Sequence, residues 1–233
     1  MAWWHHSLPA VTAYQTGVAV LGGRRVDPIA TLQLVPVAFQ ADGSPLDGDL
    51  ARLFSERQLA VDIRVGQDRM LRVGAFGAPP ASGKARDGTK IGERKPWFHH
   101  TVAHWISTWP FPHLFAMDAN TPRKEGLQWT ETKFWWWPGR TGANEGVLLG
   151  EEPVHGAHDL WREWLDSPDG KADRADVPEG GPLARSYTTA GERGWKRYDH
   201  IWASDGIRAV EMKYVYDKTV SDHALVTASI HVP

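Results

Sequence analysis

Three short polar clusters, each placed directly beside an apolar run, constrain this chain more than any other feature. They are Met117-Asp118-Ala119-Asn120-Thr121-Pro122, Arg197-Tyr198-Asp199-His200-Ile201 and Ser221-Asp222-His223-Ala224. In each cluster an Asp stands beside a second polar group where a strand is expected to meet a loop, and loops carried on rigid strands commonly hold catalytic groups. The pattern favours a fold in which several strand ends bring these side chains to one place.

Apolar periodicity predicts an α/β fold whose strands pair mostly antiparallel. Strands are expected near 32–39, 198–203, 207–216 and 224–232, with a hairpin over 61–75 and a helix from about 93 to 107. The continuous apolar run 113–117 is typical of a strand buried on both faces. A second helix is expected at 157–165, followed by a loop over 167–182.

The composition excludes several classes of site. The chain has 233 residues, of which 42% are hydrophobic, so it can bury a sizeable core, and we expect one domain over residues 1–233. It has no cysteine, which excludes disulfides, cysteine nucleophiles and cysteine-ligated zinc, so a metal would take oxygen or imidazole ligands. A net charge of −2 gives no global attraction to nucleic acid, although Arg123, Lys124, Lys133 and Arg140 could form a local basic groove.

Neither a targeting segment nor a membrane span is visible in the sequence. The chain contains no run of eighteen apolar residues, and its first residues lack the basic and apolar regions of a signal peptide. We therefore expect a cytoplasmic protein without a membrane span. The sequence does not indicate an oligomeric state.

Thirteen tryptophans are the compositional outlier, and most of them are expected to pack in the core or line a groove. The run Trp135-Trp136-Trp137 is different, because three adjacent side chains cannot all face one core. At least one of them should be exposed, as a platform for a base, a sugar or a lipid headgroup. The run lies in an irregular, Trp-rich segment, residues 123–192, which we expect to surround the active site.

The polar clusters permit metal-assisted cleavage of a phosphoester. Asp118 and Asn120 directly follow an apolar run, and their i, i+2 spacing puts both side chains on one side of the chain. His223, oriented by a buried Asp, would act as a general base or as a cationic contact to phosphate. Carboxylate oxygens suit Mg²⁺ or Mn²⁺. Ordinary turn chemistry is the competing explanation for each cluster taken singly.

The three clusters together resemble those of the endonuclease/exonuclease/phosphatase superfamily, which is related to deoxyribonuclease I. Met117-Asp118-Ala119-Asn120 resembles its Gly-Asp-x-Asn motif, the segment around Asp199 its Asp-bearing strand, and Ser221-Asp222-His223 its closing Ser-Asp-His. Gly17 to Leu21 is similar to an early strand of the family, and His158-Asp159-Leu160-Trp161-Arg162 to its Asp-x-Trp-Arg stretch. The likeness extends over essentially the whole chain.

This resemblance implies a two-sheet α/β sandwich, flanked by helices, that hydrolyses phosphodiesters or phosphomonoesters with Mg²⁺ or Mn²⁺. By the same resemblance, His223 is the catalytic histidine, Asp199 orients it, and Asp118 and Asn120 position the attacking water and the phosphate. Asp222 and Asp118 are the expected metal ligands. The superfamily's substrates include DNA, RNA, inositol phosphates and sphingolipid headgroups, so a nucleic-acid partner is one of several.

The chain departs from the family pattern in two places. Family members begin with a strand ending in Asn and a second ending in Gln-Glu, whose Glu is the main metal ligand, and neither Glu56 nor Glu93 matches it. Phe76-Gly77 stands where the family has a His or Tyr. Two hypotheses follow: an amino-terminally truncated phosphoesterase, or a non-catalytic member that binds phosphate or nucleic acid.

Overall fold

A computed structural model describes residues 2–4, 19–21, 27–32, 57–65, 69–79, 91–110, 112–135, 145–188 and 194–233. Its largest element is a six-stranded sheet with strand order β3-β4-β5-β6-β8-β7. The strands of this sheet are β3 (Asp27–Leu32), β4 (Gln58–Val65), β5 (Arg69–Gly77), β6 (His113–Asp118), β7 (His158–Asp159) and β8 (Asp199–Ala203). The mostly antiparallel pairing that the sequence predicted is found, and β5 and β6 form the parallel pair of this sheet.

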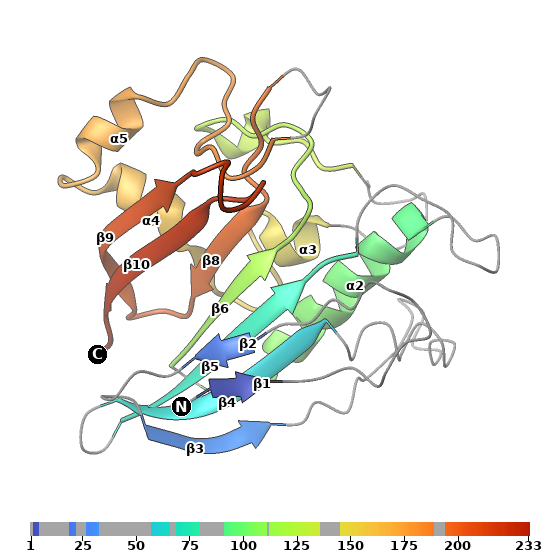
Figure 1. Ribbon diagram of the computed structural model, residues 1–233, viewed down its shortest axis with the longest axis vertical. Coiled ribbons are helices and arrows are strands. Elements are labelled where there is room, and N and C mark those ends of the chain that lie inside the picture. Colours follow the sequence, from blue (N-terminus) through green and yellow to red (C-terminus); the bar gives the residue numbers. More distant parts are fainter. Residues whose placement is uncertain are drawn as a thin grey trace.

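Two smaller sheets accompany the large one. β9 (Arg208–Val215) pairs antiparallel with β10 (Leu225–His231), and β1 (Ala2–Trp4) pairs antiparallel with β2 (Ala19–Leu21). The helices are α2 (Ile91–Ile106), α3 (Gly146–Leu149), α4 (Leu160–Asp166) and α5 (Lys171–Ala175), with a 3₁₀ turn at Trp129–Glu131. Figure 1 shows α2 alongside β5 and β6, and β9 and β10 beside β8.

Apolar clusters cover both faces of the six-stranded sheet. On one face, Phe76, Phe115 and Trp202 pack with α2 residues such as Phe98 and Val102. On the other face, β9, β10 and α4 contribute a second cluster. Alternate residues of each central strand supply the two clusters, as the pleat requires. The two-sheet α/β sandwich expected from the resemblance is confirmed.

The predicted helices and strands are largely found, with three differences. α4 begins at Leu160, not 157, because the Asp159 carboxylate accepts hydrogen bonds from the backbone N–H groups of Trp161 and Arg162 and caps the helix there. α5 lies within the predicted loop 167–182. The strand expected at 32–39 lies mostly outside the described residues, and β3 ends at Leu32.

The prediction that 113–117 is buried on both faces was wrong for one face. His113, Phe115 and Met117 are buried against the α2 side, whereas Ala116 on the opposite face is exposed. The cause is the width of the covering layer: β9 and β10 form a two-stranded sheet that covers only part of this face. A cavity of about 290 Å³ remains there, lined by residues that include Ala116, Ile201 and Val226.

Candidate active site

The pairing of β6 with β8 brings two carboxylates face to face. In the antiparallel register Asp118, the last residue of β6, lies directly opposite Asp199, the first residue of β8. Like charges in directly opposed positions of a ladder destabilise a sheet. Both residues also line the cavity beside Ala116. An unfavourable charge pair in the wall of a cavity makes this strand end the candidate active site.

His223 approaches the same carboxylates from the second sheet, two residues before β10 begins. Its Nδ1 donates to the Asp199 carboxylate, at 2.9 Å and 3.1 Å from the two oxygens. This hydrogen bond, and the negative charge of Asp199, raise the pKa of His223 against the opposing effect of burial. Nε2 makes no hydrogen bond to any residue in the described ranges, so it is the ring nitrogen available to a substrate.

Asp118, Asp199 and His223 can together present three ligand atoms that all lie within 4.8 Å of one another. Burial, followed by the neighbouring Asp199 charge, raises the pKa of Asp118 to about 6, although His223 and Arg57 act in the opposite direction. Burial and the charge of Asp199 thus outweigh the effects of His223 and Arg57 on this carboxyl. Two carboxylates and an imidazole placed this close together fit a small divalent cation such as Mg²⁺ or Mn²⁺.

Asn120 occupies a tight turn after β6. Its φ of 52° lies in the left-handed region, which Asn adopts more readily than most residues. Its backbone N–H donates to Asp118 Oδ1 at 3.1 Å, while its side-chain Nδ2 donates to the carbonyl of Ala78 at 3.1 Å. The turn chemistry considered as an alternative is thus present, and it fixes Asn120 beside Asp118.

Three buried side chains hold the carbonyls of this turn from behind. His99 Nε2 donates to the Ala119 carbonyl at 3.0 Å, and Lys95 Nζ donates to the Asn120 carbonyl at 2.9 Å. His200 Nε2 donates to the next carbonyl, that of Thr121, at 3.0 Å. Lys95 and His99 come from α2 and His200 from β8. Three successive carbonyls are therefore fixed by residues from two different elements.

We call the three carbonyls of Ala119, Asn120 and Thr121, with the side chains of Lys95, His99 and His200 that bind them, the carbonyl cradle. A buried carboxylate, Glu145, packs against it. Glu145 lies 2.9 Å from Lys95 Nζ, and it accepts hydrogen bonds from Thr121 Oγ1 at 2.8 Å and from the backbone N–H of Trp135 at 2.9 Å. Burial lowers the pKa of Lys95, which the charge of Glu145 partly restores. For His99, burial followed by the charge of Lys95 lowers the pKa well below its usual range. The imidazole of His99 is therefore neutral at pH 7.

The structure adds residues that sequence analysis did not single out. Ser186 Oγ accepts hydrogen bonds from the backbone N–H groups of Tyr198 and Asp199, at 2.7 Å and 3.1 Å. Tyr187 pairs with the backbone of His223, and the two rings lie 4.6 Å apart. Both lie in the irregular segment 123–192, where no periodicity identifies them. No sequence pattern indicated Arg57 either, although its charge lowers the pKa of Asp118.

Several other residues of the sequence-based hypotheses are not among the three that converge. Asp222 is exposed and is not among the three residues that converge, so its metal role stays a prediction. Phe76 is 3% exposed and packs edge-on against Trp105 and Phe115 in the core, so it offers no group to a substrate. Glu56 and the side chain of Glu93 lie outside the described residues, as do Trp136, Trp137 and Arg140.

The His158-to-Arg162 stretch builds structure near the site. Arg197 donates to both Asp159 and Glu125, with Nε 2.9 Å from Glu125 Oε2 and Nη1 3.1 Å from Asp159 Oδ1. Arg162 Nη2 lies 3.3 Å from Glu125, and its guanidinium stacks 3.7 Å from the Trp129 ring. Two cations thus balance two carboxylates in this buried cluster. The cluster supports β8, and Asp159, Arg162 and Trp129 also line a pocket of about 440 Å³.

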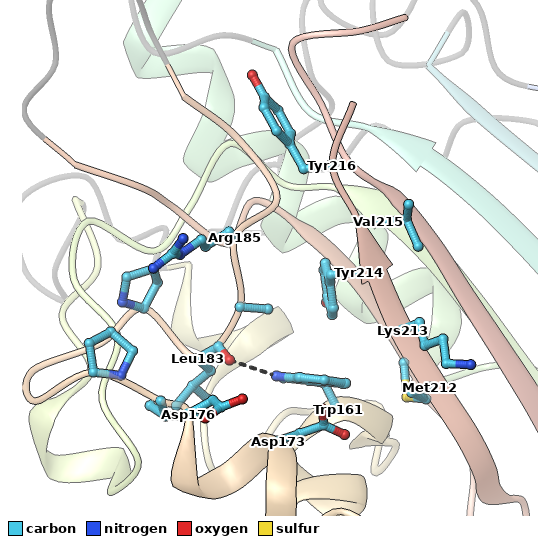
Figure 2. Close-up of a pocket in the computed structure, with 14 residues that line it drawn as sticks. Trp161, Asp173, Asp176, Leu183, Arg185, Met212, Lys213, Tyr214, Val215 and Tyr216 are labelled. Atoms are coloured by element: carbon cyan, nitrogen blue, oxygen red, sulfur yellow. Dashed lines mark hydrogen bonds between the residues drawn. The ribbon is translucent and has the colours of Figure 1, made fainter. Parts of the chain in front are cut away.

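A second pocket, of about 410 Å³, lies between β9 and residues 176–185 (Figure 2). The Trp161 indole forms part of its wall, donates to the Leu183 carbonyl at 3.0 Å and packs edge-on against Tyr214. Tyr214 in turn donates to the Asp199 carbonyl at 2.7 Å. Trp161 and Tyr214 are thus hydrogen-bonded within the protein, whereas the buried hydroxyl of Tyr216, which also lines the pocket, has no hydrogen-bond partner among the described residues.

Solved structures of similar fold were found, although no protein-family model and no curated protein sequence matches the chain. A humanized Danio rerio TDP2 is 13% identical over 89% of this chain and 68% of its own, with a TM-score of 0.51. The human Nocturnin catalytic domain, with bound sulfate, is 12% identical over 98% and 72%, also with a TM-score of 0.51. The fold is deoxyribonuclease I-like.

An AP endonuclease from Archaeoglobus fulgidus has the same deoxyribonuclease I-like fold, at 16% identity over 88% of this chain and 72% of its own, with a TM-score of 0.50. Sequence identities this low establish the shared fold alone. Within the described ranges, none of the helices has the length and hydrophobicity needed to cross a membrane.

Proposed function

We propose that this chain is a metal-dependent phosphoesterase of the endonuclease/exonuclease/phosphatase superfamily. The observation that carries the proposal is the convergence of Asp118, Asp199 and His223 at one strand end, with Asp199 bonded to His223 Nδ1. Similar structures include an AP endonuclease, which fits an activity on phosphoesters. The ordered sequence motifs add independent support.

Each residue has a distinct role in this proposal. Asp199 fixes the tautomer and direction of His223, whose Nε2 contacts the phosphate or exchanges a proton with it. Asp118 orients the attacking water, and the neighbouring Asn120 shapes the phosphate site. Asp118 and Asp199, with the exposed Asp222 as a further candidate, would hold Mg²⁺ or Mn²⁺. Such an ion, when bound, stabilises negative charge that develops on the phosphate.

The test is hydrolysis of bis(p-nitrophenyl) phosphate in the presence of Mg²⁺ or Mn²⁺. We expect turnover that EDTA abolishes and that falls by about 10²-fold or more in His223→Ala and Asp199→Asn. His231→Ala, at the far end of β10, and Asp205→Asn, beyond the far end of β8, are matched controls that should retain activity. Turnover that is insensitive to EDTA, or equal in His223→Ala, would contradict the proposal.

A non-catalytic phosphate-binding role is the second candidate, and the position of Phe76 favours it. A buried phenyl ring occupies the place where the resemblance leads us to expect a hydrogen-bond donor, which removes one contact to phosphate. This alternative predicts saturable binding of a phosphate ligand with no turnover above the His223→Ala background. The same substrate assay, together with a binding titration, separates the two functions.

A further inference from the structure

Asn120 combines an uncommon backbone conformation with two contacts to Asp118. Among the non-glycine residues of the described ranges, it alone has a positive φ, at 52°. Its backbone N–H donates to Asp118 Oδ1 at 3.1 Å, and its side-chain Nδ2 donates to Oδ2 at 3.4 Å. Both carboxylate oxygens of Asp118 therefore depend on how Asn120 is held. A sparsely populated backbone conformation persists only where the surrounding structure enforces it.

Two side chains of α2 hold the backbone on both sides of Asn120. Residues four positions apart on a helix lie on the same face, so Lys95 and His99 reach the turn together. His99 Nε2 donates to the Ala119 carbonyl at 3.0 Å, and Lys95 Nζ donates to the Asn120 carbonyl at 2.9 Å. These carbonyls belong to the peptide groups before and after the Asn120 Cα. One helix therefore restrains both backbone angles of Asn120.

The planarity of the peptide bond transmits this restraint to Asp118. The Ala119 carbonyl and the Asn120 N–H belong to one planar peptide group, so fixing the carbonyl also fixes the direction of the N–H. The hydrogen bonds run in series from the His99 imidazole, through this peptide group, to Asp118 Oδ1. Hydrogen bonds in such a series polarise one another. His99 thus acts on the Asp118 carboxylate through a single peptide group.

Stability alone does not account for a lysine at this position. Lys95 forms an ion pair with Glu145 at 2.9 Å, and both side chains are 0% exposed. Taking two charges out of water costs free energy that their attraction often fails to recover, and apolar replacement of a buried pair is often neutral or stabilising. The ammonium group does supply a donor to the Asn120 carbonyl. Holding that carbonyl gives the buried charge a role that an apolar side chain could not fill.

We propose that His99 and Lys95 are positioning residues, which set the orientation of the Asp118 carboxylate through the backbone of Asn120. Both side chains are fully buried, so they act on the reaction through the turn and not by contact with the substrate. The orientation of Asp118 is then determined by α2 as well as by β6. This role rests on the proposed phosphoesterase function.

Two substitutions at His99 separate positioning from packing. Gln retains a side-chain N–H donor, whereas Leu has none. In Mg²⁺-dependent hydrolysis of bis(p-nitrophenyl) phosphate, we expect kcat to fall by about 10- to 100-fold in His99→Leu, with KM within about threefold of wild type. His99→Gln should recover most of this loss. The matched control is His155→Leu, since His155 is also buried and hydrogen-bonds the Leu148 carbonyl at 2.8 Å; it should retain kcat.

The double variant Lys95→Met/Glu145→Gln tests the lysine. Lys95→Met alone leaves the Glu145 carboxylate buried without its cation, whereas the double variant removes both charges and should regain thermal stability. Its kcat should stay about tenfold or more below wild type, because the Asn120 carbonyl still lacks its donor. Backbone ¹⁵N relaxation measures the same restraint without turnover. Order parameters of the Asn120 and Thr121 amides should fall from about 0.85 to below about 0.6 in His99→Leu and in the double variant.

The outcomes separate this role from the proposed function. Lower kcat together with lower amide order, both restored in His99→Gln, would support the positioning role. Equal kcat in His99→Leu and His155→Leu would overturn it, as would a double variant that recovers kcat along with stability, or amides at Asn120 and Thr121 that stay rigid in every variant. A wild-type chain without turnover, whose variants still lose amide order, would retain the restraint on Asn120 and reject the phosphoesterase. If His99→Leu does not fold, the double variant decides.

Discussion

Asp118 and Asp159 lie at strand ends of the same six-stranded sheet, but their surroundings are opposite in charge. Asp159 is fully paired with Arg197 in a buried cluster where Arg162 and Arg197 balance Asp159 and Glu125. Asp118 faces a second carboxylate, Asp199, and shares a single histidine with it. The difference distinguishes a structural ion cluster from a candidate active site. In the first, two arginines neutralise two carboxylates; in the second, two carboxylates share one histidine, and a bound cation would neutralise the remaining negative charge.

The two pKa values show the same difference. Burial opposes ionisation of both groups, yet the charge of Arg197 and its hydrogen bonds lower the pKa of Asp159 to about 2. At Asp118, burial and the charge of Asp199 both act upward, and the pKa rises to about 6. Ionised Asp159 therefore stabilises the fold at neutral pH, whereas ionised Asp118 destabilises it. Strain of this kind is expected at functional sites.

Removing the cation of the balanced cluster should have the largest effect. Arg197→Met leaves the buried Asp159 and Glu125 without their main partner, and a broken buried ion pair typically costs about 3–5 kcal/mol. Urea unfolding should show this loss in the free energy of unfolding. Arg174→Ala removes an exposed ion pair between α5 and Asp166, the last residue of α4, and should cost less than about 1 kcal/mol. A loss below 1 kcal/mol in Arg197→Met would show that the cluster is not structural.

Asp118→Asn should stabilise the metal-free protein while it abolishes turnover. The raised pKa means that folding stability falls as pH rises from about 4 to above 6, by up to about 3 kcal/mol. The amide can still accept the hydrogen bond from the Asn120 N–H and carries no charge. Thermal unfolding in EDTA from pH 4 to pH 8 measures the effect.

Asp159→Asn is the matched control for this change. Because the pKa of Asp159 is lowered to about 2, its stabilisation is complete above pH 4 and is lost as pH falls toward 2. This variant should lose about 2 kcal/mol or more at pH 7, since 1.4 kcal/mol corresponds to one pKa unit. Equal pH dependence of the two Asn variants would remove the contrast between the clusters.

Addition of a divalent metal should change stability less than Arg197→Met or Asp118→Asn does. It should act on the Asp118 site and not on the Asp159 cluster. At a Mg²⁺ or Mn²⁺ concentration ten to a hundred times Kd, binding stabilises the folded chain by about 1.4–2.7 kcal/mol. The unfolding temperature of the wild type at pH 8 should therefore rise, and that of Asp118→Asn should not. A smaller rise in Asp222→Asn would support the metal role predicted for Asp222. A rise that Asp118→Asn retains in full would place the ion elsewhere.

Sequence periodicity identified the elements with clear alternation or a long apolar face. The hairpin β4–β5, the pair β9–β10 and α2 are of this kind, and each forms near its predicted bounds. α5 was missed because five residues are too few to show a helical period. The exposure of Ala116 depends on how far the second sheet extends, which is a property of packing and not of residues 113–117.

The candidate site was also predicted only in part: its residues could be identified from the sequence, but their arrangement could not. Its charged members were predicted because Asp and His beside apolar runs are visible in sequence. Their spatial relation was not predictable, because the opposition of Asp118 and Asp199 is a matter of strand register, and a shift of one residue would turn one side chain to the other face. Lys95 and Glu145 lie fifty residues apart in the chain, and no local pattern pairs them.

The carbonyl cradle has a consequence for how this site can change over evolutionary time. His99, Lys95 and His200 anchor the carbonyls of Ala119, Asn120 and Thr121 from the interior, and this interior clamp ends at Thr121. The carbonyl of Arg123 is instead held at the surface, by Lys196. Insertions or substitutions beyond that clamp can remodel the outer loop without moving Asp118. Reaction geometry and ligand preference can therefore vary as separate modules on one scaffold.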